Sequence, residues 1–65
     1  MKRQKLIRHL TKHHCHLLRE GKKHAIYQNP IDKSQASVER HNELSDLLCN
    51  IVCKQLSIPL ISVRP

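Results

Sequence analysis

Apolar residues recur along the chain with two spacings, one helical and one alternating. Near the start, Leu6, Ile7 and Leu10 fall at positions i, i+1 and i+4 among basic residues. Side chains with this spacing lie on one side of a helix, so residues 2–13 are expected to form a short amphipathic helix. The basic residues would spread over its solvated surface, where most lysines have no specific role.

The middle of the chain shows the shorter period of strands. We expect three strands, at residues 15–19, 24–28 and 36–39. A turn at residues 20–23 joins the first two, and a polar loop at residues 29–35 leads to the third. In the second strand Ala25 and Tyr27 share one face. Pro30 ends this strand because proline has no amide N–H for a sheet ladder.

The last third of the chain has the clearest helical spacing. Its apolar positions are Leu44, Leu47, Leu48, Ile51, Val52 and Leu56. Asn42 or Ser45 can cap the helix at its N-terminus, and Asp46 and Lys54 suit the two ends of its dipole. The wide apolar stripe should cover one sheet face together with the first helix. The apolar segment 58–61 ends the helix, and its sequence fits core, interface or a frayed end.

The predicted order is therefore helix, three strands, helix. It indicates an α+β fold in which two helices pack on one face of a three-stranded antiparallel sheet. We expect one domain spanning residues 1–65. Double-stranded-RNA-binding domains share this dsRBD-like α-β-β-β-α layout, but a layout alone does not assign a function.

The charge of the chain points to a polyanionic partner. Twelve Lys and Arg against five Asp and Glu give a formal charge of +7, which favours nucleic acid first and an acidic protein second. Tyr27 is the only aromatic residue, which argues against recognition by stacking bases on a sheet of rings. We expect Tyr27 to be a core residue.

The length of the chain bounds its stability and its location. A domain of this size buries only about 60% of its unfolded surface, so a partner or self-association would add useful burial. No apolar run is long enough for a transmembrane helix, and His9, Lys12 and His13 interrupt any signal-peptide core. The expectation is a cytoplasmic protein without membrane contact.

Histidines and cysteines are dense enough to raise the question of a metal site. His13, His14, Cys15 and His16 are nearly consecutive, and Cys49 and Cys53 fall at i, i+4. The paired spacing of structural zinc sites is missing, so we expect no metal and three reduced, buried thiols. In this interpretation Cys15 and Leu17 face the core while the neighbouring histidines are exposed.

The segment with the most distinctive chemistry runs from residue 21 to residue 27. Gly21, the only glycine, opens it at a predicted turn, and Lys22, Lys23 and His24 follow. An imidazole titrates near neutral pH, and fixed positive charge beside it suits phosphodiester chemistry. A surface histidine without a chemical role is the alternative, because histidines next to turns are common.

The chain resembles the HicA toxin family over roughly residues 4–60. The resemblance lies in the leading helix, the segment 15–21, the Gly-x-x-His-x-x-Tyr pattern of residues 21–27, the segment 37–41 and the closing helix. Members of this family are small toxins of type II toxin–antitoxin systems. They cleave mRNA as ribosome-independent endoribonucleases, adopt a dsRBD-like fold and are neutralised by a HicB antitoxin encoded alongside.

The resemblance implies a role for particular residues. His24 matches the histidine that these toxins need for cleavage, and Gly21 matches the glycine of the preceding turn. The resemblance also implies single-stranded mRNA as substrate and a HicB-like antitoxin as partner, in a hetero-oligomer. Glu39 is a departure, because many members have proline there, and its negative charge would lie near the expected RNA surface.

The chemistry expected from these residues needs no metal or other cofactor. His24 would act as a general base on a ribose 2′-OH, with the charge on the phosphoryl oxygens stabilised by basic side chains. The expected RNA-binding residues are Gly21, Lys22, Lys23, Arg40 and His41. The acid that protonates the leaving oxygen is unassigned, with His41 and water both open. We expect broad, salt-dependent cleavage.

Two other interpretations stay open at this point. One is a non-catalytic RNA- or protein-binding module of dsRBD-like fold, which the dense histidines and Glu39 leave in play. The other is a zinc-dependent DNA-binding module using Cys15 or Cys49. Replacing His24 with alanine separates the first from the enzyme, and metal analysis of the purified protein tests the second.

Overall fold

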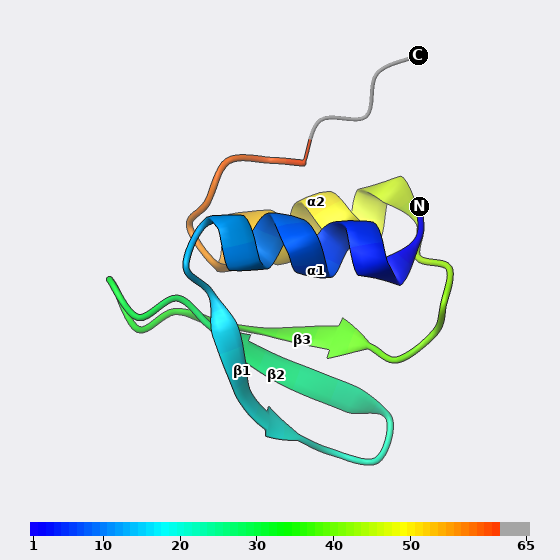
Figure 1. Ribbon diagram of the computed structural model, residues 1–65, viewed down its shortest axis with the longest axis horizontal. Helices are drawn as coiled ribbons and strands as arrows, with labels where there is room; N and C mark the ends of the chain where they lie inside the picture. Colours follow the sequence, from blue (N-terminus) through cyan, green and yellow to red (C-terminus); the bar gives the residue numbers. More distant parts are fainter. Residues whose placement is uncertain (62–65) are drawn as a thin grey trace.

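Two helices and three strands follow one another in the predicted order (Figure 1). The computed structural model describes residues 1–61, and the last four residues of the predicted domain lie outside this range. The elements are α1 (Arg3–Lys12), β1 (His16–Glu20), β2 (His24–Gln28), β3 (Gln35–Glu39) and α2 (Asp46–Gln55). Their bounds differ from the predicted ones by only one or two residues, and the α+β class is confirmed.

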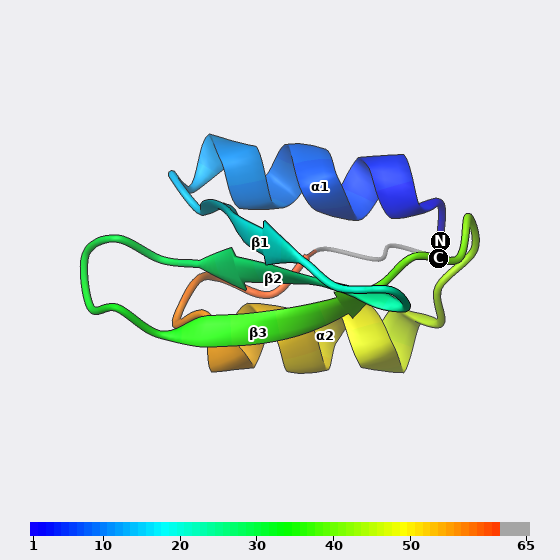
Figure 2. The ribbon, with the colours of Figure 1, turned by 90° about the horizontal axis from the view of Figure 1, so that it is seen from below.

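The three strands form an antiparallel sheet with β2 in the middle. Both helices lie on one side of it, above the strands in Figure 1, and Figure 2 views the molecule from the side of the sheet. On that side Ala25 and Tyr27 of β2 pair with Val38 and Ala36 of β3, and all four are buried. The other sheet face has no covering layer among residues 1–61. The alternation predicted for β2 and the core position of Tyr27 are therefore confirmed.

One apolar cluster joins the helices to the sheet. Leu6 and Leu10 of α1 are fully buried, as are Cys49 and Cys53 of α2. Burial raises the pKa of the thiols of Cys15, Cys49 and Cys53, because desolvation disfavours the thiolate. All three are unbonded to one another, which confirms the expected reduced, buried cysteines.

The buried stripe of α2 is narrower than the sequence suggested. Leu47 is 72% exposed and Ile51 is 42% exposed, so their expected contact with the sheet is wrong. Val52 is buried as predicted, and Cys49 and Cys53 lie beside it in place of Leu47 and Ile51. Ser45 caps the helix, its Oγ accepting the Leu48 N–H at 3.1 Å. Asp46 and Lys54 lie in its first and last turns.

The segment that follows α2 also contributes to this core. Ile58 and Ile61 are buried, so the segment after α2 belongs to the core. The buried Asn29, just after β2, donates its side-chain N–H to the Leu56 carbonyl at 2.8 Å and accepts the Ile31 N–H at 3.0 Å. Asn29 therefore ties the end of β2 to the end of α2.

Strand β1 lies at the edge of the sheet and is exposed along its whole length. Leu17 pairs with Tyr27 but is 45% exposed, so its predicted place in the core is wrong. Cys15, just before the strand, is buried as predicted, while His14 and His16 are exposed. Leu17 therefore lies on the helix side of an edge strand but is only partly covered by residues 1–61.

The register of β1 shifts by one residue between Leu17 and Arg19. Leu17 pairs with Tyr27 and Arg19 with Ile26, so Leu18 is the extra residue of a β-bulge. In a regular strand Arg19 would lie on the same face as Leu17. The bulge moves it to the uncovered face instead.

None of the helices over residues 1–61 is long and apolar enough to cross a membrane.

Candidate functional site

The turn between β1 and β2 holds His24 at the start of the central strand. The Gly21 N–H donates to the His24 carbonyl at 2.7 Å, which closes the turn. A Cβ on Gly21 would lie 3.3 Å from that same carbonyl oxygen, and the φ of Gly21 is not positive. The glycine is therefore favoured here by a close approach of two backbone segments rather than by a left-handed conformation.

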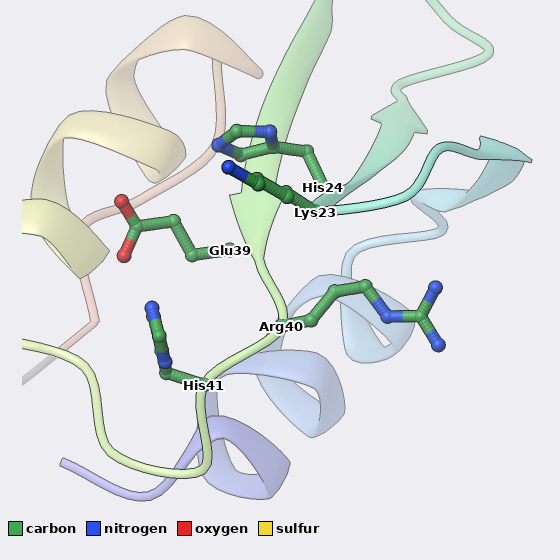
Figure 3. A pocket seen from close by; sticks show the side chains of 5 residues that line it. All are labelled: Lys23, His24, Glu39, Arg40 and His41. Atoms are coloured by element: carbon green, nitrogen blue, oxygen red, sulfur yellow. The ribbon is translucent and has the colours of Figure 1, made fainter.

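Arg40, which directly follows β3, contacts this turn from across the central strand. Its Nη1 donates to the Gly21 carbonyl at 3.2 Å. In Figure 3 its guanidinium extends away from the side chains of His24 and His41. The contact joins the end of β3 to the turn and so fixes how far apart Gly21 and Arg40 lie. Arg40 was predicted as an RNA-binding residue, and the bond assigns it a contact within the protein.

A hollow of about 530 Å³ opens beside His24. It is lined by Lys23, His24, Glu39, Arg40 and His41. Lys23 and His24 project side by side, and the Glu39 carboxylate lies between them and the His41 ring (Figure 3). The antiparallel pairing of His24 with Glu39 brings the two histidines to this place, because His41 follows β3 by two residues.

The loop that carries His41 is fastened to the first turn of α1. Arg3 donates its backbone N–H to the Asn42 carbonyl at 2.8 Å and its Nε to the Glu39 carbonyl at 2.9 Å. Lys2 Nζ lies 2.7 Å from the Glu43 carboxylate on the same segment. This ion pair raises the pKa of Lys2 and lowers the pKa of Glu43. His41 is thus exposed but sits on a loop held at both sides.

A second hollow of about 340 Å³ lies on the opposite side of His24. Its lining residues are Arg19, Glu20, Gly21, Lys22, Lys23, His24 and Ile26. Arg19 and Ile26 were not among the predicted site residues. Alternation from Cys15 and Leu17 would place Arg19 toward the helices, and only the bulge at Leu18 turns it to this side. No signal in the sequence marks that extra residue.

The charges around His24 are not neutralised by ion pairs. Between residues 1 and 61, all ion pairs within 4.0 Å join the N-terminus or Lys2 to Glu43 or Asp46. Lys22 and Lys23 are exposed, and Glu39 is half-buried. Both sides are therefore basic on balance. The side toward Arg19 carries one arginine and two lysines against Glu20, and the side toward His41 carries a lysine, an arginine and two imidazoles against Glu39.

The histidine-rich segment lies at the other end of the sheet. His16 pairs with Gln28, whereas His24 pairs with Glu39. His13 packs edge-on against His9, with ring centroids 4.7 Å apart. Desolvation, and then the positive neighbours His9 and Lys12, lower the pKa of His13. Within the described residues, no three His, Cys, Asp or Glu side chains gather as metal ligands would.

The fold and the site together define a small α+β domain with an exposed histidine between two hollows. Comparisons with protein-family models, with curated proteins and with solved structures found no match. What the domain does must therefore be inferred from its own residues and from the pattern of residues 21–27.

Proposed function

We propose that this chain is an endoribonuclease toxin of a type II toxin–antitoxin system, with His24 as its general base. One observation carries the proposal: His24 is exposed at the start of β2, between two hollows that share it and Lys23 as lining residues. An RNA strand that passes over His24 places one phosphate at the histidine and the two flanking phosphates in the hollows. The resemblance to HicA toxins points to the same histidine.

The proposed reaction uses the 2′-OH of the substrate as nucleophile. His24 removes its proton, and the oxygen attacks the adjacent phosphate. Lys22 and Lys23 lie next to the histidine in the turn and stabilise the charge that grows on the phosphoryl oxygens. Because lysines contact the backbone of RNA and not its base edges, the cleavage has little sequence preference and weakens with salt.

A HicB-like antitoxin is the proposed protein partner. A protein that covers His24 and the basic turn blocks access of RNA. It also adds buried area to a domain that has little of its own. Binding to the folded toxin alone raises its apparent stability by mass action. The uncovered sheet face and the two hollows are the surfaces available for such a partner on the side of His24.

The proposal is tested with purified protein and with cells. Wild type and His24→Ala are incubated with a single-stranded RNA in EDTA, and each is expressed in bacteria while growth and mRNA integrity are followed. We expect cleavage and growth arrest for the wild type alone, with equal RNA binding by both. Equal cleavage by two equally folded proteins would contradict the role of His24.

A second candidate is a non-catalytic RNA-binding module. The observation that favours it is Glu39, whose carboxylate lies in the hollow beside His24 and opposes a phosphate there. In that case the wild type binds single-stranded RNA with micromolar or tighter affinity but leaves it intact over hours. The same incubation with EDTA separates the two functions, and metal analysis of the purified protein tests the zinc-dependent DNA-binding alternative.

A further inference from the structure

We propose that His41 is the general acid of the reaction and forms an acid–base pair with His24 across the larger hollow. This inference rests on the proposed ribonuclease function and adds the proton donor that the sequence left unassigned. The observation behind it is the arrangement of the two imidazoles. Both line the same hollow, His24 from the start of β2 and His41 from the loop after β3 (Figure 3).

Cleavage by a 2′-OH needs two proton transfers on opposite sides of one phosphorus. The attacking oxygen loses a proton on one side, and the leaving 5′-oxygen gains one on the other. A single imidazole cannot occupy both positions at once. The hollow presents His24 on one wall and His41 on the opposite wall, as in-line displacement between two groups requires.

The proton and bond changes then balance within the site. His24 takes the 2′-OH proton while the new O2′–P bond forms. The P–O5′ bond breaks, and His41 gives its proton to the departing 5′-oxygen. The products are a 2′,3′-cyclic phosphate and a free 5′-OH, with His24 left protonated and His41 neutral. Exchange with water restores both side chains for the next turnover.

The structure holds His41 in place for this role. Arg3 binds the carbonyls of Glu39 and Asn42, on both sides of His41, at 2.9 and 2.8 Å. Three other charged groups face the hollow or flank it: Lys23 from the turn, Glu39 from β3 and Arg40 next to His41. Lys23 faces the phosphate, and Glu39 lies between the two imidazoles, where it repels the substrate but takes no proton in this scheme.

Two substrates distinguish an acid from a binding residue. The first is a dinucleotide such as UpA, whose leaving group is a poor alkoxide. The second is uridine 3′-(4-nitrophenyl phosphate), whose phenolate leaves without protonation. Purified wild type, His24→Ala, His41→Ala and Glu39→Gln are compared on both. His16→Ala is the matched histidine control, because His16 is also exposed but lies at the far end of the sheet.

We expect His41→Ala to lose about 10²- to 10⁴-fold on UpA, the usual contribution of a positioned acid. On the nitrophenyl ester it should stay within about threefold of wild type, because that leaving group needs no acid. His24→Ala should lose activity on both substrates. The alkaline limb of the pH–rate profile should disappear in His41→Ala on UpA. Glu39→Gln should bind RNA more tightly, because it removes the negative charge that lies between the two imidazoles.

Three outcomes would overturn the pairing. Wild-type rates for His41→Ala on UpA exclude His41 as the acid. Equal losses on both substrates make it a binding residue. Loss of turnover in Glu39→Gln makes the carboxylate, and not His41, the partner of His24. A wild type that cleaves neither substrate nor single-stranded RNA contradicts the proposed function itself, so the two failures remain distinguishable.

Discussion

The Gly21 N–H donates to the His24 carbonyl at 2.7 Å, and a Cβ on Gly21 would lie 3.3 Å from the same oxygen. Because no positive φ is involved, Gly21→Ala should change the free energy of unfolding by less than about 1 kcal/mol. The crowded carbonyl must move, so the amide of residue 21 should exchange with solvent faster. Denaturant unfolding and hydrogen exchange measure the two effects. A loss above about 2 kcal/mol would show that the turn has no room to adjust.

Arg19 should contribute to RNA affinity through the smaller hollow. Arg19→Ala removes one exposed cation from the hollow beside His24. We expect single-stranded RNA binding to weaken about two- to fivefold, as for exposed charge pairs. The slope of log K against log salt should fall by about one unit.

The matched control for Arg19 is Arg8→Ala. Arg8 is also exposed, but it belongs to α1 and lines neither hollow beside His24. Fluorescence anisotropy over a salt series compares the two variants. Equal losses would mean that only net charge matters and that the hollow has no particular role.

Asn29 should be the most sensitive polar residue of the core. It is 5% exposed, and Asn29→Ala leaves the Leu56 carbonyl and the Ile31 N–H without their side-chain partner. An unsatisfied buried group costs about 1–3 kcal/mol. Urea denaturation should show a loss in this range. Asn42→Ala is the control, since its side chain is exposed and its carbonyl bond to Arg3 is made by the backbone.

Asp32 should make part of the stability depend on pH. Its carboxylate accepts from the hydroxyl and the N–H of Ser34 at 2.7 and 3.0 Å, which lowers the pKa of Asp32. A lowered pKa means that the contribution is present above the ordinary pKa of aspartate, about 3.9. It is lost as the pH falls through the lower folded value.

The test of Asp32 compares the wild type with Asp32→Asn between pH 7 and pH 2. The amide keeps an acceptor oxygen but does not titrate, so the variant should lose less stability on acidification. An NMR titration of the Asp32 carboxyl reports its pKa directly. Identical acid unfolding curves would show that the turn gains nothing from the charge.

The sequence predicted the fold well because both helices and the middle strands follow simple spacings. Ala25 and Tyr27 are buried through strict alternation, and Ser45 caps α2 through its position before the apolar stripe. Leu17 and Leu47 were misplaced because hydrophobicity does not say how far a helix layer extends. Leu17 lies on the edge strand β1, Leu47 lies on the outward side of α2, and both are exposed.

The candidate site was predicted in part. Lys23 and His24 are consecutive residues, so their proximity could be predicted directly from the sequence. The position of His41 opposite His24 depends on the register of β2 with β3, and that of Arg19 depends on a bulge. Register and bulges arise from contacts between distant segments, so a single sequence does not reveal them.

The extra residue at Leu18 also bears on how the molecule behaves at high concentration. An open strand such as β1, with Leu17 and Leu18 exposed, is a template on which another chain can add and start a fibril. The offset in its ladder breaks the regular row of N–H and C=O groups that such growth requires. Deleting Leu18 would straighten that row while leaving Arg19 paired with Ile26 on the uncovered face. The same bulge thus interrupts the edge at which other chains could add, and it lies beside the cation nearest to the histidine on which the proposed chemistry depends.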